Sequence, residues 1–417
     1  MTGAEAERYL LSLELFGMRF GLDRMRRLMT ALGHPERRFD SIHVVGTNGK
    51  SSTVRMIAAI IAHHGLRTGA YLSPHLVSFG ERIRIDDRDL EPAAFGAAVG
   101  RAARAAARVD RSAADDDDRV TQFEALTAAA YSELAERGVE VAVIEAGLGG
   151  RYDATNVIPS KVQVLTSVGL EHTRWLGPTL TDIATEKLDV VQPGETLVLG
   201  ADLEPEVMEV AERVAGERAA RIVVGGTDPG VPVGAPGAYQ RRNFALARAA
   251  AQAFLGSLSE EAVTAAAADV RVPGRLQQID TAPLTLVDGA HNVDGMRALA
   301  ESLPEVTAGR APVIAVLSIL DDKDAAGMLA ALGAGGVRID ALVLTSSQNP
   351  RALPPPTLKS LARQLHGPPG EVVGDPFRAL ARARELAGPE GAVIAAGSLY
   401  LIADLLAMGP RERASVL

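Results

Sequence analysis

Residues 42–53, with the sequence IHVVGTNGKSST, combine an apolar run, a glycine-bearing loop and a lysine followed by hydroxyl residues. Gly46 and Gly49 allow a tight turn that brings backbone N–H groups close to phosphate oxygens. The start of the following helix adds partial positive charge, Lys50 can reach the β- and γ-phosphates, and a following hydroxyl can bind Mg²⁺. The general pattern G-x-x-x-x-G-K-[ST] is not met, because Val44 stands where its first glycine would be. The alternative is an ordinary glycine-rich turn between a strand and a helix, but the order of the parts predicts a nucleotide-phosphate site.

Three more side chains with catalytic or metal-binding chemistry follow downstream. Glu145 ends an apolar run and precedes a glycine-rich turn, His172 comes shortly after another apolar run, and Lys187 lies in a helical pattern. Ligand sites of parallel sheets gather at the carboxyl ends of the strands, so Glu145 is placed to hold Mg²⁺ on nucleotide phosphates. Each residue also has a purely structural interpretation: a hydrogen-bonded loop acid, a packed or solvated histidine and a surface lysine.

The rest of the chain must supply the elements that position these side chains. Short β-rich apolar runs alternate with alanine-rich helical stretches, which predicts an α/β fold with mostly parallel sheets. The expected strands cover residues 42–45, 139–144, 162–166, 196–199, 222–224, 284–287, 313–316, 341–344 and 393–395. The expected helices include residues 52–64, 123–137, 243–254 and 376–386, the last with Asp375 as N-cap and Pro376 at its first position.

The length of 417 residues indicates two domains, because a single hydrophobic core rarely exceeds about 250–300 residues. Residues 225–237 are rich in glycine and proline and are expected to form a loop. Residues 270–275 separate an alanine-rich helix from a new strand. We therefore expect an ATP-binding domain at 1–272, a linker at 273–279 and a second domain at 280–417.

Composition excludes several classes of function. The formal charge of −9 argues against a general nucleic-acid or anionic-membrane surface, and the absence of cysteine excludes disulfides and thiolate sites. The first residues lack the basic segment of a secretory signal, and no apolar run is long enough to cross a membrane, so we expect a cytoplasmic protein. The acidic run at 115–118 is expected to be a solvated loop rather than a metal site.

The motifs together resemble a known family. GTNGK is similar to the phosphate loop of the Mur ligase superfamily, and the wider chain resembles folylpolyglutamate synthase/dihydrofolate synthase. The resemblance begins in residues 9–35, which look like the family's opening helices. It continues in the segments YLSPHLVSFGERIRID at 71–86, TQFEALT at 121–127, VIEAGLGGRYDATNV at 143–157, TSVGLEHTRWLGPTLTDIATEKLDVVQPG at 166–194, LVDGAHN at 286–292, VLSILDDKDAAGML at 316–329 and AAGSLYLIADLL at 395–406.

The resemblance implies an N-terminal P-loop ATPase-like domain with a mostly parallel sheet and a smaller C-terminal Rossmann-like α/β domain. It also implies the roles of individual residues, with Lys50, His172 and Lys187 as catalytic groups. The implied ATP-binding residues are Asn48, Gly49, Lys50, Ser51, Ser52, Asn243, Arg275 and Asp288. The implied metal ligands, for two Mg²⁺ ions, are Ser52, Ser73, Glu145, His172 and Lys187, the last as a carbamylated lysine. The implied pterin-binding residues are Thr121, Gln122, Phe123, Glu124, Tyr152, Asp153 and Ala154.

Several positions depart from the family pattern. Ser51 stands where the family usually has glycine, and Glu171 replaces the aspartate before the histidine. Leu188 and Asp189 replace the Ala-Gly pair after the lysine, so Asp189 brings negative charge near a site that must hold phosphates. The remaining departures are Gln122, Tyr152 and Val293.

The resemblance implies an ATP-dependent ligase that joins glutamate to a pterin carboxylate, of dihydropteroate or of a reduced folate, through an acyl phosphate. The expected partners are therefore these small molecules, with no nucleic acid and no membrane, and the expected oligomeric state is a monomer. The alternatives are a Mur-type ligase with another carboxylate acceptor, a non-catalytic nucleotide-binding module, and a kinase or NTPase switch.

Overall fold

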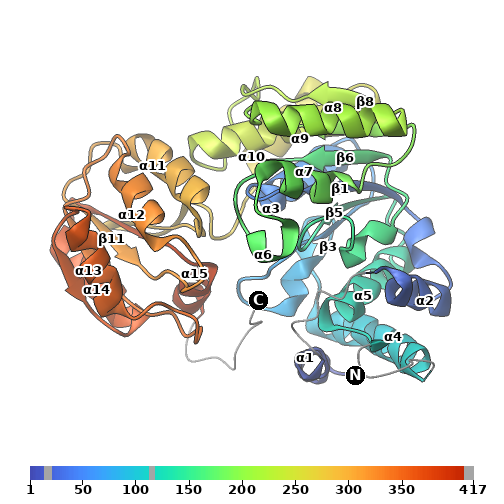
Figure 1. Cartoon of the computed structure of the whole chain (residues 1–417), viewed down its shortest axis with the longest axis horizontal. Coiled ribbons are helices and arrows are strands. Elements are labelled where there is room, and N and C mark those ends of the chain that lie inside the picture. The colour runs from blue at the N-terminus through green and yellow to red at the C-terminus, as the bar shows by residue number, and fades with distance from the viewer. Residues whose placement is uncertain (14–20, 112–117, 408–417) are drawn as a thin grey trace. The chain divides into compact units, whose positions relative to one another are not determined.

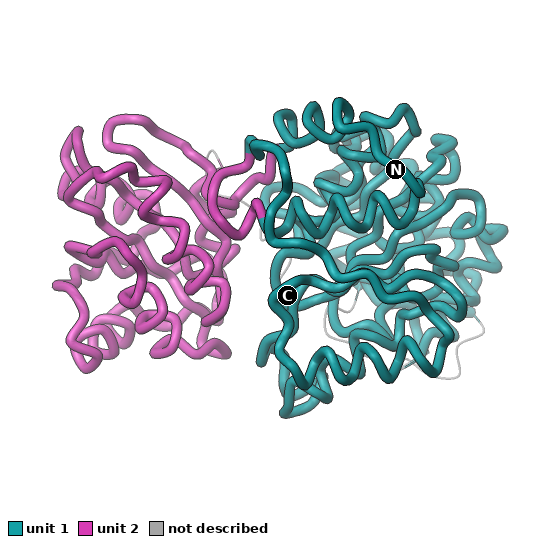
Figure 2. Tube along the Cα trace, turned by 90° about the horizontal axis from the view of Figure 1, so that it is seen from above, with its two compact units in different colours: residues 1–234, 242–270, 417 teal, residues 235–241, 271–416 magenta. Residues whose placement is uncertain are grey.

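The computed structural model describes residues 1–13, 21–111 and 118–407. Residues 14–20 of the expected opening helices and residues 115–117 of the acidic run lie outside the described residues. The chain divides into two compact units (Figure 2). The first comprises the described parts of 1–234 together with 242–270, and the second comprises 235–241 and the described chain from 271 onward.

The first unit is built on an eight-stranded sheet. Its strands are β1 (Asp40–Val45), β2 (Thr68–Tyr71), β3 (Ile83–Ile85), β4 (Arg88–Asp89), β5 (Val141–Glu145), β6 (Val162–Leu165), β7 (Thr196–Leu199) and β8 (Arg221–Val224). Their order across the sheet is β4-β3-β2-β5-β1-β6-β7-β8, and Figure 1 labels β3, β5, β1, β6 and β8 of this series. The strands from β2 to β8 in this order run parallel, whereas β3 and β4 are added antiparallel at one edge. The central position of β1 places the loop that follows it at the middle of the sheet's carboxyl edge.

The helices of this unit begin at residues suited to that position. The side chain of Thr121 caps α5 and forms a reciprocal capping box with Glu124, and Thr179 does the same with Asp182 for α7. The helices are α1 (Gly3–Ser12), α2 (Asp23–Ala31), α3 (Lys50–His63), α4 (Pro92–Asp110), α5 (Gln122–Glu136), α6 (Thr173–Leu176), α7 (Leu180–Leu188), α8 (Pro205–Arg218), α9 (Ala238–Leu255) and α10 (Glu260–Asp269). The first four residues of α9 group with the second unit.

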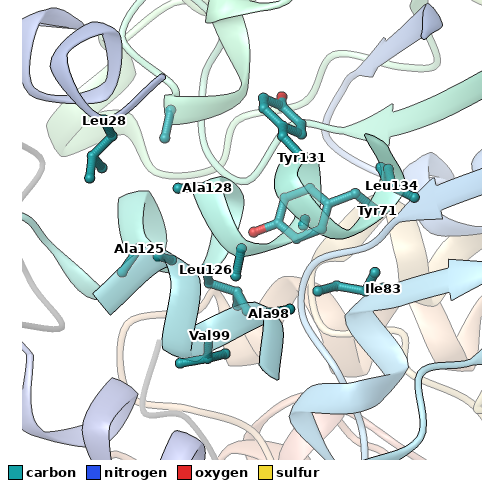
Figure 3. Close-up of a cluster of buried hydrophobic side chains, with 14 of the residues drawn as sticks. Leu28, Tyr71, Ile83, Ala98, Val99, Ala125, Leu126, Ala128, Tyr131 and Leu134 are labelled. Carbon is teal, nitrogen blue, oxygen red and sulfur yellow. The ribbon is translucent and has the colours of Figure 1, made fainter. Parts of the chain in front are cut away.

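A large hydrophobic core joins α1, α2, α4 and α5 to the sheet. Leu28, Val99 and Tyr131 from three of these helices lie in one cluster with Tyr71 of β2 (Figure 3). All four residues are completely excluded from solvent. A second cluster packs α7 and α8 on β6 and β7. The two clusters pack on different parts of the sheet, the first on β2, β3 and β5 and the second on β6 and β7, and so support the strands that lead to the loops at its carboxyl edge.

The second unit contains a six-stranded sheet with the order β13-β12-β11-β14-β10-β9. Its strands are β9 (Gln277–Thr281), β10 (Leu284–Val287), β11 (Val313–Leu317), β12 (Ala341–Leu344), β13 (Gly370–Val372) and β14 (Ala392–Ala396). Its helices are α11 (Val293–Thr307), α12 (Ala325–Gly333), α13 (Pro355–Gln364), α14 (Pro376–Ala387) and α15 (Leu399–Leu406). Only β9 runs antiparallel to its neighbour among these described strands. Asp375 caps α14 and Pro376 occupies its first turn, as expected.

The architecture confirms the expected α/β fold with two mostly parallel sheets. All nine expected strands are present with ends within two residues of the observed ones, whereas α9 begins five residues earlier than expected. Strands β2, β3, β4, β9 and β13 were not expected from the sequence, because the first three are no longer than four residues and the other two lie at the edges of their sheet. The expected linker at 273–279 overlaps β9 from residue 277. In the described part of the chain, every helix is too short or too polar to span a membrane.

Candidate functional site

The glycine-bearing loop expected to bind phosphate, called the phosphate loop below, lies between β1 and α3, as the sequence predicts. Gly49 caps α3 with a left-handed backbone at φ 85°. A side chain at Gly46 could not be accommodated, since a Cβ there would lie 2.0 Å from Thr166 Oγ1. The hydroxyl of Thr166 also donates to the carbonyl of Asn48 over 2.6 Å, and the Asn48 N–H donates to Ser167 Oγ over 2.9 Å. The end of β6 therefore holds the loop in shape.

Two lysines meet on this loop. The ammonium of Lys50 donates to the carbonyls of Gly46 (3.1 Å) and Thr47 (3.2 Å). Lys187 of α7 donates to the same Gly46 carbonyl over 2.9 Å and is buried. Burial, and then the neighbouring charge of Lys50, lower the pKa of Lys187 to about 7. A substantial fraction of Lys187 is therefore a neutral amine near neutral pH, which is the nucleophilic form of a lysine.

Glu145 stands at the carboxyl end of β5, beside the first turn of α3. It is 1% exposed. Ser51 Oγ donates to its Oε1 over 2.9 Å, and the Ser73 N–H donates to its Oε2 over 3.1 Å. The structure thus brings together the expected metal ligands Glu145 and Ser73 and places them next to Ser51 and Ser52 of the phosphate loop. Ser51, which departs from the family pattern, makes a direct contact with this carboxylate.

Asn243 also reaches the loop. A Cβ at Gly49 would lie 2.7 Å from Asn243 Oδ1, so the side chain of this α9 residue packs against the loop backbone. Asn243 and Gly49 both belong to the first unit. The expected ATP-binding residues of the first unit therefore converge on one loop.

The departures near Lys187 have partners in the structure. Asp189 accepts from Arg218 over 3.1 Å and lies 3.4 Å from Arg151 Nε, so two guanidinium groups balance its charge. Leu188 is fully buried in the core beneath α7. Glu171 is 9% exposed, and its charge acts on Lys187 in the direction that raises the pKa of that lysine. The negative charge that Asp189 adds is therefore balanced by ion pairs with two arginines.

His172 occupies a different environment from the residues around Gly46. It is exposed, adopts a left-handed backbone at φ 53° and begins the short helix α6. Among the described residues, no group of three or more His, Asp or Glu side chains is arranged to hold a metal ion. The structure thus gathers Lys187, Glu145 and Ser73 near the phosphate loop, and the side chain of His172 is exposed.

The expected pterin-binding segment at 121–124 takes part in extensive structural contacts. Besides capping α5, Glu124 forms a buried ion pair with Arg24 of α2 over 3.1 Å. Gln122 Nε2 donates to the carbonyl of Leu10 in α1 over 2.9 Å. Phe123 packs on the glycine-rich turn, since a Cβ at Gly147 would lie 2.6 Å from its Cζ. Of this segment, only Phe123 is placed by these contacts beside the turn that follows Glu145.

The remaining expected pterin-binding residues lie just beyond that turn. Asp153 and Ala154 are 6% exposed, whereas Tyr152 is 41% exposed. Burial raises the pKa of Asp153, against the hydrogen bonds from Thr155 and Leu148 that lower it. The guanidinium of Arg151 lies over the ring of Tyr152, with its Cζ 5.9 Å from the ring centroid.

Arg275 and Asp288 lie together in the second unit. Asp288 accepts from the Tyr239 hydroxyl (2.6 Å) and from the N–H groups of Leu276 (2.9 Å) and Ala290 (2.8 Å). The guanidinium of Arg275 covers Gly289, where a Cβ would lie 1.9 Å from its Nη1. Burial, and then the charge of Asp288, raise the pKa of Tyr239 well above its usual value. Asp288 therefore fixes the backbone around Arg275.

Sequence reasoning missed Tyr239, Arg24 and Arg82. Arg82 is 1% exposed, donates to His75 Nδ1 over 2.9 Å and lies over the ring of Phe79 at 5.5 Å. Tyr239 precedes Asn243 by four residues, which places both on the same face of one helix, and this spacing was the available signal for Tyr239. Arg24 and Arg82 had no local signal, because each lies among other arginines in the sequence.

Comparison with known proteins agrees with this geometry. The family model described as "Mur ligase, glutamate ligase domain" matches residues 274–399. The dihydrofolate synthase/folylpolyglutamate synthase of Mycobacterium tuberculosis is 37% identical over 388 residues, which is 83% of this chain and 78% of that protein.

Solved structures show the same fold along almost the whole chain. Folylpolyglutamate synthase of M. tuberculosis, complexed with ADP, matches with a TM-score of 0.88 at 32% identity over 97% of both chains. The bifunctional folylpolyglutamate synthase/dihydrofolate synthase of Yersinia pestis, complexed with AMPPNP and a manganese ion, matches with a TM-score of 0.83 at 30% identity over 97% of both chains. The chain therefore belongs to the folylpolyglutamate synthase/dihydrofolate synthase family, a family of ATP-dependent ligases in the Mur ligase superfamily.

Proposed function

We propose that the chain joins glutamate to the carboxylate of a pterin-bearing acceptor, dihydropteroate or a reduced folate, at the expense of ATP. One arrangement carries this proposal: Lys50 and Lys187 both donate to the carbonyl of Gly46 in the phosphate loop, and Glu145 accepts from Ser51 beside them. The names of its relatives, dihydrofolate synthase and folylpolyglutamate synthase, support the choice of acceptor.

The first chemical step needs positive charge on the nucleotide phosphates. The acceptor carboxylate attacks the γ-phosphorus of ATP and ADP leaves, which produces an acyl phosphate. Lys50 exchanges its loop carbonyls for the phosphoryl oxygens and neutralises the charge that would repel the carboxylate. Asn48, Gly49, Ser51 and Ser52 contribute the loop and helix start that bind the phosphates, and Asn243 is placed to contact the nucleotide.

The donor set beside the loop fits a magnesium ion. Glu145 is a buried carboxylate that accepts from the hydroxyl of Ser51 and from the backbone N–H of Ser73, and Ser52 follows Ser51 at the start of α3. Carboxylate and hydroxyl oxygens are hard donors of the kind that Mg²⁺ takes. We propose Ser52, Ser73 and Glu145 as the residues that hold it, with His172 and Lys187 for a second ion. Bound Mg²⁺ supplies Lewis acidity and charge neutralisation at the phosphoryl oxygens.

We propose that Lys187 is carbamylated. Its lowered pKa supports this, because only the neutral amine adds to CO₂, with loss of a proton, to give a carbamate. The modification converts a cation into an anionic oxygen donor. It also removes one of the two positive charges that now compete for the Gly46 carbonyl.

The second step needs the amine of glutamate to attack the acyl carbon, with release of inorganic phosphate. We propose that Arg275 and Asp288 contact the nucleotide from the linker and from the C-terminal domain, respectively. The pterin pocket is proposed to contain Thr121, Gln122, Phe123, Glu124, Tyr152, Asp153 and Ala154.

The domain organisation and the state of the protein belong to the same proposal. We propose domain boundaries at 1–272, 273–279 and 280–417, a monomeric state and a cytoplasmic location.

The direct test supplies MgATP and glutamate with either dihydropteroate or a reduced folate and identifies products by mass spectrometry. We expect dihydrofolate from the first acceptor, a folate extended by one glutamate from the second, or both, with ADP released in step with the amide. ADP release without any amide would indicate an NTPase. Amide formation only with an unrelated carboxylate would move the chain to another Mur-type acceptor.

A further inference from the structure

His43 is a buried histidine that the mechanism above does not use. It lies in the middle of β1, directly before the phosphate loop, and is completely excluded from solvent. Its Nε2 lies 2.9 Å from Thr155 Oγ1, and its Nδ1 is buried without a hydrogen-bond partner. A buried ring nitrogen without a partner is costly, so the contact made by the other nitrogen needs an explanation.

The neighbours of Thr155 fix the direction of this hydrogen bond. The Thr155 hydroxyl donates to Asp153 Oδ1 in a short contact, and the Thr155 N–H donates to the same oxygen over 3.0 Å. Asp153 Oδ2 accepts from the Leu148 N–H over 2.8 Å. Because the single hydroxyl proton of Thr155 points at Asp153, the oxygen can only accept from His43.

His43 is therefore a neutral imidazole with its proton on Nε2. The other tautomer would place two lone pairs against each other at Thr155 and leave a buried N–H without an acceptor. Burial lowers the pKa of His43 to about 3, which agrees with a ring that stays neutral. The hydrogen bonds run in one direction, from His43 through Thr155 to Asp153.

Asp153 also holds the turn that runs from Glu145 to the helix α7. Its bond to Leu148 fastens the segment that directly follows Glu145. The far side of this turn rests on α7: the Arg151 N–H donates to the Glu186 carbonyl over 3.0 Å, and a Cβ at Gly150 would lie 2.4 Å from the Lys187 carbonyl. The turn thus spans from Glu145 to the helix that carries Lys187.

We propose that His43 and Thr155 are positioning residues that orient the Asp153 carboxylate and, through it, the turn at 146–153 on the acceptor side of the site. The effect on the reaction rests on the proposed function. The hydrogen-bond relay from His43 through Thr155 to Asp153 includes no bond to Lys50 or to the other residues of the phosphate loop. Its loss is therefore expected to affect use of the acceptor more than binding of ATP.

The kinetic test compares three variants. Thr155→Val keeps the shape of the side chain but removes the hydroxyl, and it is expected to raise the KM for the pterin acceptor about tenfold while the KM for ATP stays unchanged. Thr155→Ser keeps the hydroxyl and is expected to restore the wild-type KM. Tyr131→Phe is the matched control, because it removes a 2.9 Å hydrogen bond to the Thr155 carbonyl and leaves the relay intact.

A spectroscopic test does not depend on catalysis. The ring ¹⁵N shifts of His43 in the wild type are expected to show a protonated Nε2 and an unprotonated Nδ1 at neutral pH, and Thr155→Val is expected to change the Nε2 resonance. A protonated Nδ1 or an imidazolium would overturn the relay. So would equal damage by Thr155→Ser and Thr155→Val, or a parallel rise of both KM values. If the wild type forms no amide, the proposed function fails, and the ¹⁵N shifts still decide on the relay.

Discussion

Replacement of Lys50 by methionine is expected to lower kcat for ATP-dependent amide formation by about 10³-fold. The ammonium lies on the carbonyls of Gly46 and Thr47 and has no carboxylate in these contacts, so it is available for phosphoryl oxygens. Methionine has a similar length but no charge. The acceptor carboxylate would then approach the γ-phosphate without neutralisation. The rate of ADP formation in the presence of acceptor and glutamate measures the effect.

Lys161→Met is the matched control for this experiment. Lys161 carries the same charge in the same unit, pairs with Asp40 over 2.6 Å and has a side chain that is 52% exposed. Loss of its charge is expected to leave the rate unchanged, because an exposed ion pair contributes little. Equal rates for Lys50→Met and the wild type would contradict the assignment of the phosphate loop.

Replacement of Lys187 by alanine is expected to reduce activity by at least about 10²-fold, with partial recovery in acetate or another short carboxylate. The added carboxylate would supply the oxygen donors that the proposed carbamate would provide in the wild type. In the wild type, we expect ¹³C-labelled bicarbonate to give a carbamate carbon resonance that disappears in Lys187→Ala.

The pH dependence of the carbamate follows from the same lysine. As the pH falls below about 7, Lys187 becomes protonated and can no longer add to CO₂, so carbamate occupancy and activity are expected to fall on the acid side. Above that pH the amine is neutral and the dependence on protonation disappears. A Lys187→Arg variant keeps a cation but cannot form the carbamate under these conditions, and wild-type activity in this variant would refute the modification.

The sequence was most informative where a site depends on contiguous residues. The phosphate loop is formed by neighbouring residues from Gly46 to Ser52, so its order alone predicted a turn that the structure confirms between β1 and α3. The Asp375 cap of α14 was predictable for the same reason. Short edge strands such as β4 were not, because pairing with a neighbour rather than local composition defines them.

Contacts between distant segments were not accessible from one sequence. Ser51 and Glu145 are 94 residues apart, and Arg24 and Glu124 are 100 residues apart. Neither pair has a pattern that would join its members before the chain folds. The ion pairs of Asp189 with Arg151 and Arg218 were likewise not predictable, because the two arginines lie on other segments.

The central claim is that ATP activates the acceptor carboxylate as an acyl phosphate. The most direct measurement uses dihydropteroate or a reduced folate with ¹⁸O in the reacting carboxylate and follows the label by ³¹P NMR and mass spectrometry. We expect one labelled oxygen to pass from the carboxylate into inorganic phosphate for each amide formed. Amide formation with unlabelled phosphate would contradict the account.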